Sequence, residues 1–99
     1  MARSQTGPAF SDISSKIGVA NQSQKLTGVN EDRVCLIVQN VSADTLWIDF
    51  GRDATQGAPS FRLPAGALFT MEKEHGYVDT SEVFIIGPNA GALYTAREA

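Results

Sequence analysis

Residues 33–51, RVCLIVQNVSADTLWIDFG, carry the clearest β-strand pattern in this chain, and the expected fold is built on them. Its first part holds an unbroken apolar run at residues 34–38, and successive side chains on a β-strand point to opposite faces of a sheet. Such a strand is apolar on both faces, which is typical of an interior strand covered on both sides. In residues 45–50, Leu, Ile and Phe alternate with Thr, Trp and Asp. Because residues 40–44 are small and polar, we expect a turn there and a central β-hairpin over the whole stretch.

The flanking sequence continues the same pattern. Turn-forming residues recur about every 8–12 positions, the spacing that favours an antiparallel sandwich or barrel. Residues 83–86 (VFII) are apolar on both faces, like residues 34–38, and predict a second interior strand. The sequence therefore predicts an all-β fold, a small antiparallel β-sandwich or barrel of about seven short strands. These strands are expected at residues 25–29, 33–40, 45–50, 61–63, 67–72, 83–86 and 93–97.

Residues 1–25 differ from the rest, because Ser, Gln, Asn, Gly and Ala dominate them. We expect an extended N-terminal arm over residues 1–25 and a β domain over residues 26–99. A short helix from Ser11 to Ile17 is an alternative, but a helix of that length is marginal in water. Phe10, Ile13 and Ile17 have no apolar partner within the arm, so they are predicted to anchor it on a neighbouring subunit. A terminus without a role is the plain alternative.

Charge and hydropathy exclude some partners. The chain has 99 residues and a net charge of -3, so we expect no nucleic acid partner, because phosphate binding needs a basic surface. No apolar run approaches the ~20 residues of a membrane span, and we expect no membrane partner. The arm carries three Lys/Arg against one Asp, whereas residues 26–99 carry five Lys/Arg against ten Asp/Glu. One copy's arm could therefore lie on the next copy's acidic body, but chance is the simpler explanation of so small an imbalance.

The residue chemistry predicts neither a metal site nor a catalytic site. Cys35 is the single cysteine and lies in the most apolar run, so it is expected to be a buried hydrophobe without a disulfide. A zinc site needs three or four converging ligands, which one cysteine and the single His75 do not supply. We therefore expect no enzyme, no cofactor and no metal. A small hydrolase or cupin-type enzyme is an alternative, and it would depend on His75.

Trp47 is the sharpest candidate for a binding residue. It shares a strand face with Thr45 and Asp49, and an aromatic ring beside polar groups can stack on a sugar or anchor a protein interface. The plain alternatives are core filling and cover under the loop at residues 51–60. Together with Phe10, Ile13 and Ile17, Trp47 completes the set of predicted partner-binding residues.

Three segments carry a resemblance to a known type of protein. They are RVCLIVQNVSADTLWIDFG (33–51), ATQGAPSFRLPAG (54–66) and EVFIIGPNAGALYTAREA (82–99). In this order, over residues 24–99, the chain resembles small tailed-bacteriophage virion structural proteins of the head decoration, cement or attachment type. The resemblance implies a β module present in repeated copies or as a homo-oligomer. It also implies binding to the major capsid protein or other virion proteins, in a virion assembled in bacterial host cytoplasm. The alternative is a carbohydrate-binding or host-attachment module, or a tail or appendage adaptor of a phage.

Overall fold

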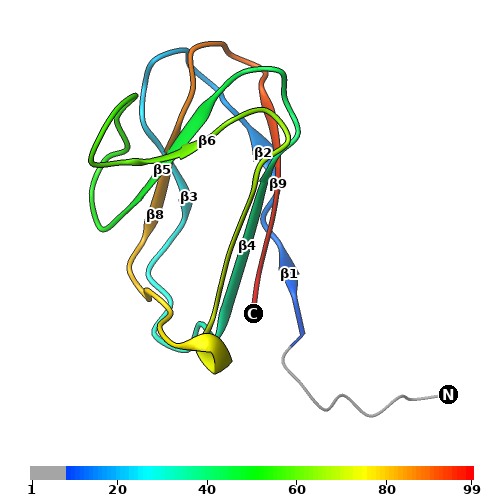
Figure 1. Ribbon diagram of the computed structural model, residues 1–99, viewed down its shortest axis with the longest axis vertical. Helices are drawn as coiled ribbons and strands as arrows, with labels where there is room; N and C mark the ends of the chain where they lie inside the picture. Colours follow the sequence, from blue (N-terminus) through cyan, green and yellow to red (C-terminus); the bar gives the residue numbers. More distant parts are fainter. Residues whose placement is uncertain (1–8) are drawn as a thin grey trace, which may run out of the picture.

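This computed structural model describes residues 9–99. These residues form two antiparallel β-sheets that face each other as a sandwich (Figure 1). Sheet A has the strand order β1-β9-β4-β7, with β2 also paired to β9, and sheet B has the order β3-β8-β5-β6. The predicted all-β sandwich is confirmed, and the seven predicted strands correspond to β3–β9. The elements are β1 (Ser11–Asp12), β2 (Ser15–Lys16), β3 (Gln24–Thr27), β4 (Cys35–Asn40), β5 (Leu46–Phe50), β6 (Phe61–Leu63), β7 (Leu68–Glu72), a 3-10 helix η1 (Lys73–His75), β8 (Val83–Ile86) and β9 (Leu93–Glu98).

The core lies between the two sheets and follows the alternation of the strands. Every second side chain of β4, β5 and β8 points inward, and nearly all of these side chains are fully buried. Both predicted interior strands are interior: β4 lies between β9 and β7, and β8 lies between β3 and β5. The fully buried apolar residues on the inner faces of these three strands are Leu36, Val38, Leu46, Ile48, Val83 and Ile85.

The prediction of a hairpin at residues 33–51 is wrong, because β4 belongs to sheet A and β5 to sheet B. The turn between them is organised by Asn40, which is fully buried. Its Nδ2 donates to the carbonyl oxygens of Asp44 (2.6 Å) and Leu63 (2.9 Å), and its Oδ1 accepts from the Ser42 amide (2.9 Å). The chain thus passes from one sheet to the other. Two strands with apolar inner stripes bury those stripes against each other only when they lie in opposite layers.

The outer face of sheet B is covered by the loop at residues 51–60 (Figure 1). The loop is fixed at one side where Ser60 Oγ donates to Asp49 Oδ2 (3.0 Å) and at the other where the Ala54 amide donates to Ser23 Oγ (3.0 Å). Ala54 is buried, and so is Ile86, an outward-facing residue of β8. Part of the outer face of sheet B is therefore buried, whereas Trp47 on the same face is half-buried.

The N-terminal segment does not leave the domain. Ser11–Asp12 and Ser15–Lys16 pair antiparallel with β9 of the same chain, and the Ile17 amide donates to the Ala92 carbonyl (2.8 Å). The prediction that the arm lies outside the β domain is therefore wrong for residues 11–17. The physical reason is that these residues pair with β9 and bury Ile17 on the inner side of the sheet. Residues 1–8 of the predicted arm lie outside the described residues.

Candidate functional site

The outer face of sheet A carries exposed apolar side chains. Leu68 of β7 is 60% exposed, Leu93 of β9 is 54% exposed, and Val41, directly after β4, is 49% exposed. The Val41 amide donates to the Leu93 carbonyl (3.3 Å), and Leu68 lies opposite Gln39, on the neighbouring strand of the same sheet. We call Val41, Leu68 and Leu93 the outer-face patch. Exposed apolar residues that gather on one face are typical of a protein interaction site.

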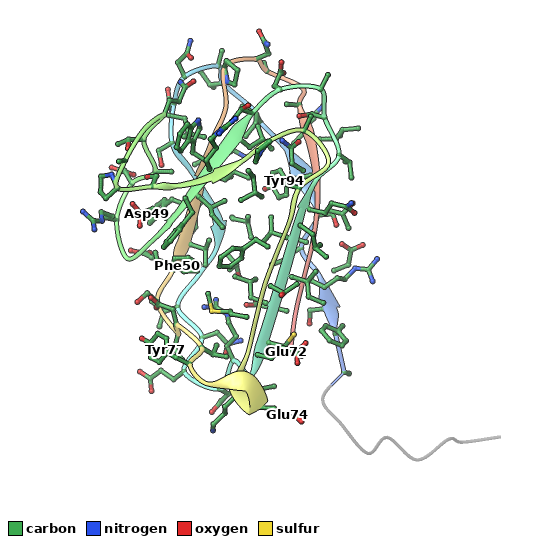
Figure 2. The ribbon with its side chains drawn as sticks, in the orientation of Figure 1. Asp49, Phe50, Glu72, Glu74, Tyr77 and Tyr94 are labelled. Carbon is green, nitrogen blue, oxygen red and sulfur yellow. The ribbon has the colours of Figure 1, made fainter. Side chains whose placement is uncertain are left out.

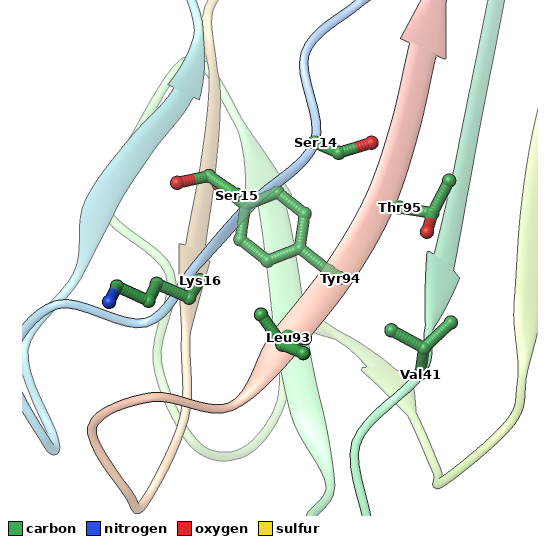
Figure 3. Close-up of a pocket in the computed structure, with 7 residues that line it drawn as sticks. All are labelled: Ser14, Ser15, Lys16, Val41, Leu93, Tyr94 and Thr95. Carbon is green, nitrogen blue, oxygen red and sulfur yellow. The ribbon is translucent and has the colours of Figure 1, made fainter.

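A shallow groove adjoins this patch (Figure 3). Its volume is about 420 Å³, and its walls come from the N-terminal segment, the end of β4 and the start of β9. Both apolar side chains and hydroxyl groups line it, and Lys16 supplies one ammonium group. Such a surface suits an apolar segment of a partner whose backbone groups bond to the hydroxyls. The lining residues are Ser14, Ser15, Lys16, Val41, Leu93, Tyr94 and Thr95.

Tyr94 anchors the groove from the inside. It is buried between the two sheets (Figure 2), and its ring points from β9 toward Ser15 (Figure 3). Burial raises the pKa of the Tyr94 hydroxyl, and hydrogen bonds with Gln24 and Ser15 oppose that rise. The hydroxyl is therefore neutral at physiological pH. It joins the N-terminal segment to the sandwich, and the groove wall depends on it.

Charged groups lie at the other end of β9. Asp12 Oδ1 accepts from the Ser14 amide (3.0 Å) and lies 3.6 Å from Arg97 Nε. The hydrogen bonds with Ser14, followed by the charge of Arg97, lower the pKa of the Asp12 carboxyl. The outer face of sheet A is therefore apolar near Leu93 and charged near Arg97.

The structure does not bring the predicted binding residues together. Ile17 is 0% exposed and belongs to the core, so its prediction as a partner anchor is wrong. Ile13 is partly buried against the same core. Phe10 is 52% exposed at the start of the described chain. Trp47 is half-buried on the outer face of sheet B, opposite Arg62 of β6 and Ile86 of β8.

The polar partner expected for Trp47 already has an internal role. Asp49 is buried, and Figure 2 shows it on the side of sheet B that faces the loop at residues 51–60. Its Oδ1 accepts from the Phe50 amide (2.8 Å), while its Oδ2 accepts from Ser60 Oγ and lies 3.4 Å from Arg52 Nε. These contacts hold the loop in place, so the carboxylate is not presented beside Trp47 for a sugar.

The sequence reasoning missed the outer-face patch. Alternation assigns Leu68 and Thr70 to one face of their strand and Phe69 and Met71 to the other. The first pair mixes an apolar with a polar residue, whereas the second pair is entirely apolar. That difference marks the face of Leu68 as the outer one. The signal was therefore present in residues 68–71, but it acquires meaning only when Val41 and Leu93 are known to share that face.

Other kinds of site find no support in residues 9–99. Among the side chains that the structure describes in this range, which do not include that of His75, no group of three or more His, Cys, Asp or Glu is arranged to hold a metal ion. The helical structure described there is too short and too polar to cross a membrane.

Comparison of the chain with family models, with curated proteins and with solved structures yields no match.

Proposed function

We propose that the protein is a structural component of a tailed-phage virion, of the capsid decoration or cement type. It binds the viral shell in repeated copies through the outer face of sheet A. The observation that carries this proposal is the outer-face patch, where three large apolar side chains are about half exposed or more. The resemblance of residues 24–99 to such proteins supports the same role. The protein is thus assembled in the bacterial host cytoplasm and resides in the virion.

The two sheets differ in a way that favours an external partner for sheet A. The strand β4 is apolar on both faces, which calls for cover on both sides. Its inward residues meet sheet B, but Ile37 on the outer face is only half-buried. On the outer face of sheet B, Ile86 is buried, and the loop at residues 51–60 lies on that side of the sheet. A shell protein seated on sheet A supplies the missing layer.

The energetics favour attachment in many copies. Full burial of one large aliphatic side chain contributes about 1.5–3 kcal/mol, so a patch of three gives a modest affinity for a single contact. Repeated copies on one particle, linked to one another, convert modest contacts into firm attachment. Phe10, exposed at the start of the described chain, provides a further proposed contact to the shell.

The test compares wild-type and variant chains on particles. Phage particles from the source culture are purified by density gradient, and the chain is quantified relative to the major shell protein by mass spectrometry. We expect the ratio of this chain to the major shell protein to be the same in every preparation of particles. A chain carrying Leu93→Lys, supplied in place of the wild type, should lose most of its occupancy, because a charge then enters the apolar contact.

The matched control is Val29→Lys. Val29 is 65% exposed but lies in the loop between β3 and β4, outside the patch. The occupancy of the Val29→Lys variant on particles should equal that of the wild type. Absence of the wild-type chain from particles would refute the proposal, and equal losses in both variants would refute the assigned surface. Binding on a glycan array that Trp47→Ala abolishes would favour the carbohydrate-binding alternative.

A further inference from the structure

The strand β7 forms one edge of sheet A, and part of its backbone faces away from the sheet. Its pairing with β4 is regular, and the Asn40 amide donates to the Ala67 carbonyl (3.0 Å) just before the strand begins. Antiparallel pairs alternate between hydrogen-bonded and non-bonded positions. The N–H and C=O groups of Leu68 and Thr70 therefore point toward the edge, and both residues are exposed.

The other sheet edges in residues 9–99 carry features that discourage pairing with another chain. The strands β1 and β2 have two residues each, and β6 has three residues followed by Pro64. The register of β3 shifts between Lys25 and Thr27, and Lys25 is exposed. Short strands, proline, lysine and bulges are the usual protection of an edge. The strand β7 has five residues in continuous register, with neither a proline nor a bulge.

We propose that β7 pairs antiparallel with β7 of a second copy of this chain, about a two-fold axis at Phe69. In this register Leu68 of each copy lies opposite Thr70 of the other, and the edge-facing groups of these residues form four main-chain hydrogen bonds. The arrangement is isologous and closed, because the same edge serves both copies. The proposal does not depend on a role in a virion.

An aromatic cluster at the same edge supports a second copy as the occupant. The ring of Phe69 lies 5.8 Å from that of Phe50 and 6.1 Å from that of Phe61, measured between centroids. Phe61 is 51% exposed, and Phe69 is only half-buried. The proposed register places the two Phe69 residues directly opposite each other, so each cluster gains a ring. Aromatic pairs prefer offset or edge-on contacts at centroid distances of about 4.5–7 Å, and the distances within the cluster already fall in this range.

Sedimentation equilibrium tests the pairing. We expect the purified wild-type chain to approach twice its mass of 10.6 kDa as its concentration rises to about 1 mM, the range of weak association. Leu68→Lys should raise the dissociation constant at least about tenfold, because a charged side chain then lies at the paired edge. The matched control is Leu93→Lys, which puts the same charge on the same outer face but on the interior strand β9, and it should dimerise like the wild type.

Disulfide trapping tests the register. Two variants, Leu68→Cys and Thr70→Cys, are made in a Cys35→Ala background, mixed and oxidised. Opposite residues in a hydrogen-bonded antiparallel pair lie about 5.5 Å apart between Cα atoms, which suits a disulfide. The mixed dimer should therefore exceed its statistical share over the two homodimers. A wild-type chain that stays monomeric at about 1 mM, a Leu93→Lys variant that also loses the dimer, or a purely statistical mixture would overturn the proposal.

Discussion

Arg33, two residues before β4, forms an ion pair with Glu98, the last residue of β9, and the arginine side chain of this pair is fully buried. Arg33 Nε donates to Glu98 Oε1 at 2.9 Å, and the Arg33 side chain is 0% exposed. The remaining donors of the guanidinium reach the carbonyl oxygens of Asp79 (2.7 Å), Ser81 (2.9 Å) and Gly28 (3.0 Å). One side chain therefore satisfies backbone groups from two separate loops, which no shorter donor could do.

Replacing Arg33 should destabilise the fold strongly. Arg33→Ala removes the Arg33 donor from Glu98 Oε1, although Thr27 Oγ1 still donates to Glu98 Oε2, and from three carbonyl oxygens. We expect a loss of about 3–5 kcal/mol in the free energy of unfolding. Arg33→Lys should lose less, because it keeps the charge but cannot span the same acceptors. Urea denaturation measures both. Arg62→Ala, at an exposed arginine of β6, is the control and should stay within about 0.5 kcal/mol of the wild type.

Gly87 should not tolerate a side chain. A Cβ placed there would lie 2.6 Å from Leu46 Cδ2 and 3.2 Å from Ile17 Cγ1, and both of these residues are fully buried. We expect Gly87→Ala to reduce stability by about 1–3 kcal/mol through overpacking. Gly57→Ala is the matched control, because a Cβ at that position meets nothing within 4 Å. If crowding is the cause, the penalty at Gly87 should shrink in a Leu46→Val background, whereas an unchanged penalty would contradict it.

The N-terminal segment should contribute to stability through one residue. Ile17→Ala empties a fully buried site and should reduce the free energy of unfolding by about 2–5 kcal/mol. Phe10→Ala, at a side chain that is 52% exposed, should change it by no more than about 0.5 kcal/mol. Thermal and urea unfolding of both variants provide the comparison. Similar small effects at both positions would mean that the segment is not packed on its own domain in solution.

The thiol of Cys35 should be unreactive in the folded protein. Burial, followed by the nearby charge of Glu72, raises the pKa of this thiol. Iodoacetamide should therefore alkylate it far more slowly than in urea, because each unit of pKa removes about nine-tenths of the thiolate at a given pH. Rapid alkylation of the folded chain would show that the site opens.

The raised pKa of Cys35 also makes the stability of the fold depend on pH. Because the folded-state pKa is raised, the unfolded chain loses its thiol proton at a lower pH than the folded chain does. The neutral thiol therefore contributes its full stabilisation of the folded state below the ordinary thiol pKa. It is lost as the pH rises from that value, about 8.5, to the folded one. The stability of the wild type should therefore fall more over this range than that of Cys35→Ala. Parallel curves would contradict the prediction.

How much could be predicted from the sequence differs between the strands and the surface. The positions of β3–β9 followed from apolar runs and turn residues, because these reflect local geometry and side-chain alternation. Residues 11–17 were harder, because Ile13 and Ile17 are four positions apart. That spacing places two residues on one face of a helix or of a strand alike. Only the pairing with β9 decides that both point inward.

Three features follow from the amino-acid sequence alone: an all-β chain, interior strands within residues 33–40 and 83–86, and a buried cysteine. They depend only on which side chains avoid water. Three other features became evident only in the folded chain: β4 and β5 lie in opposite sheets, Ile17 belongs to the core, and Val41, Leu68 and Leu93 are exposed on one face. The reason is that partners far apart in the sequence are chosen by the packing of the whole chain, and no local pattern records that choice.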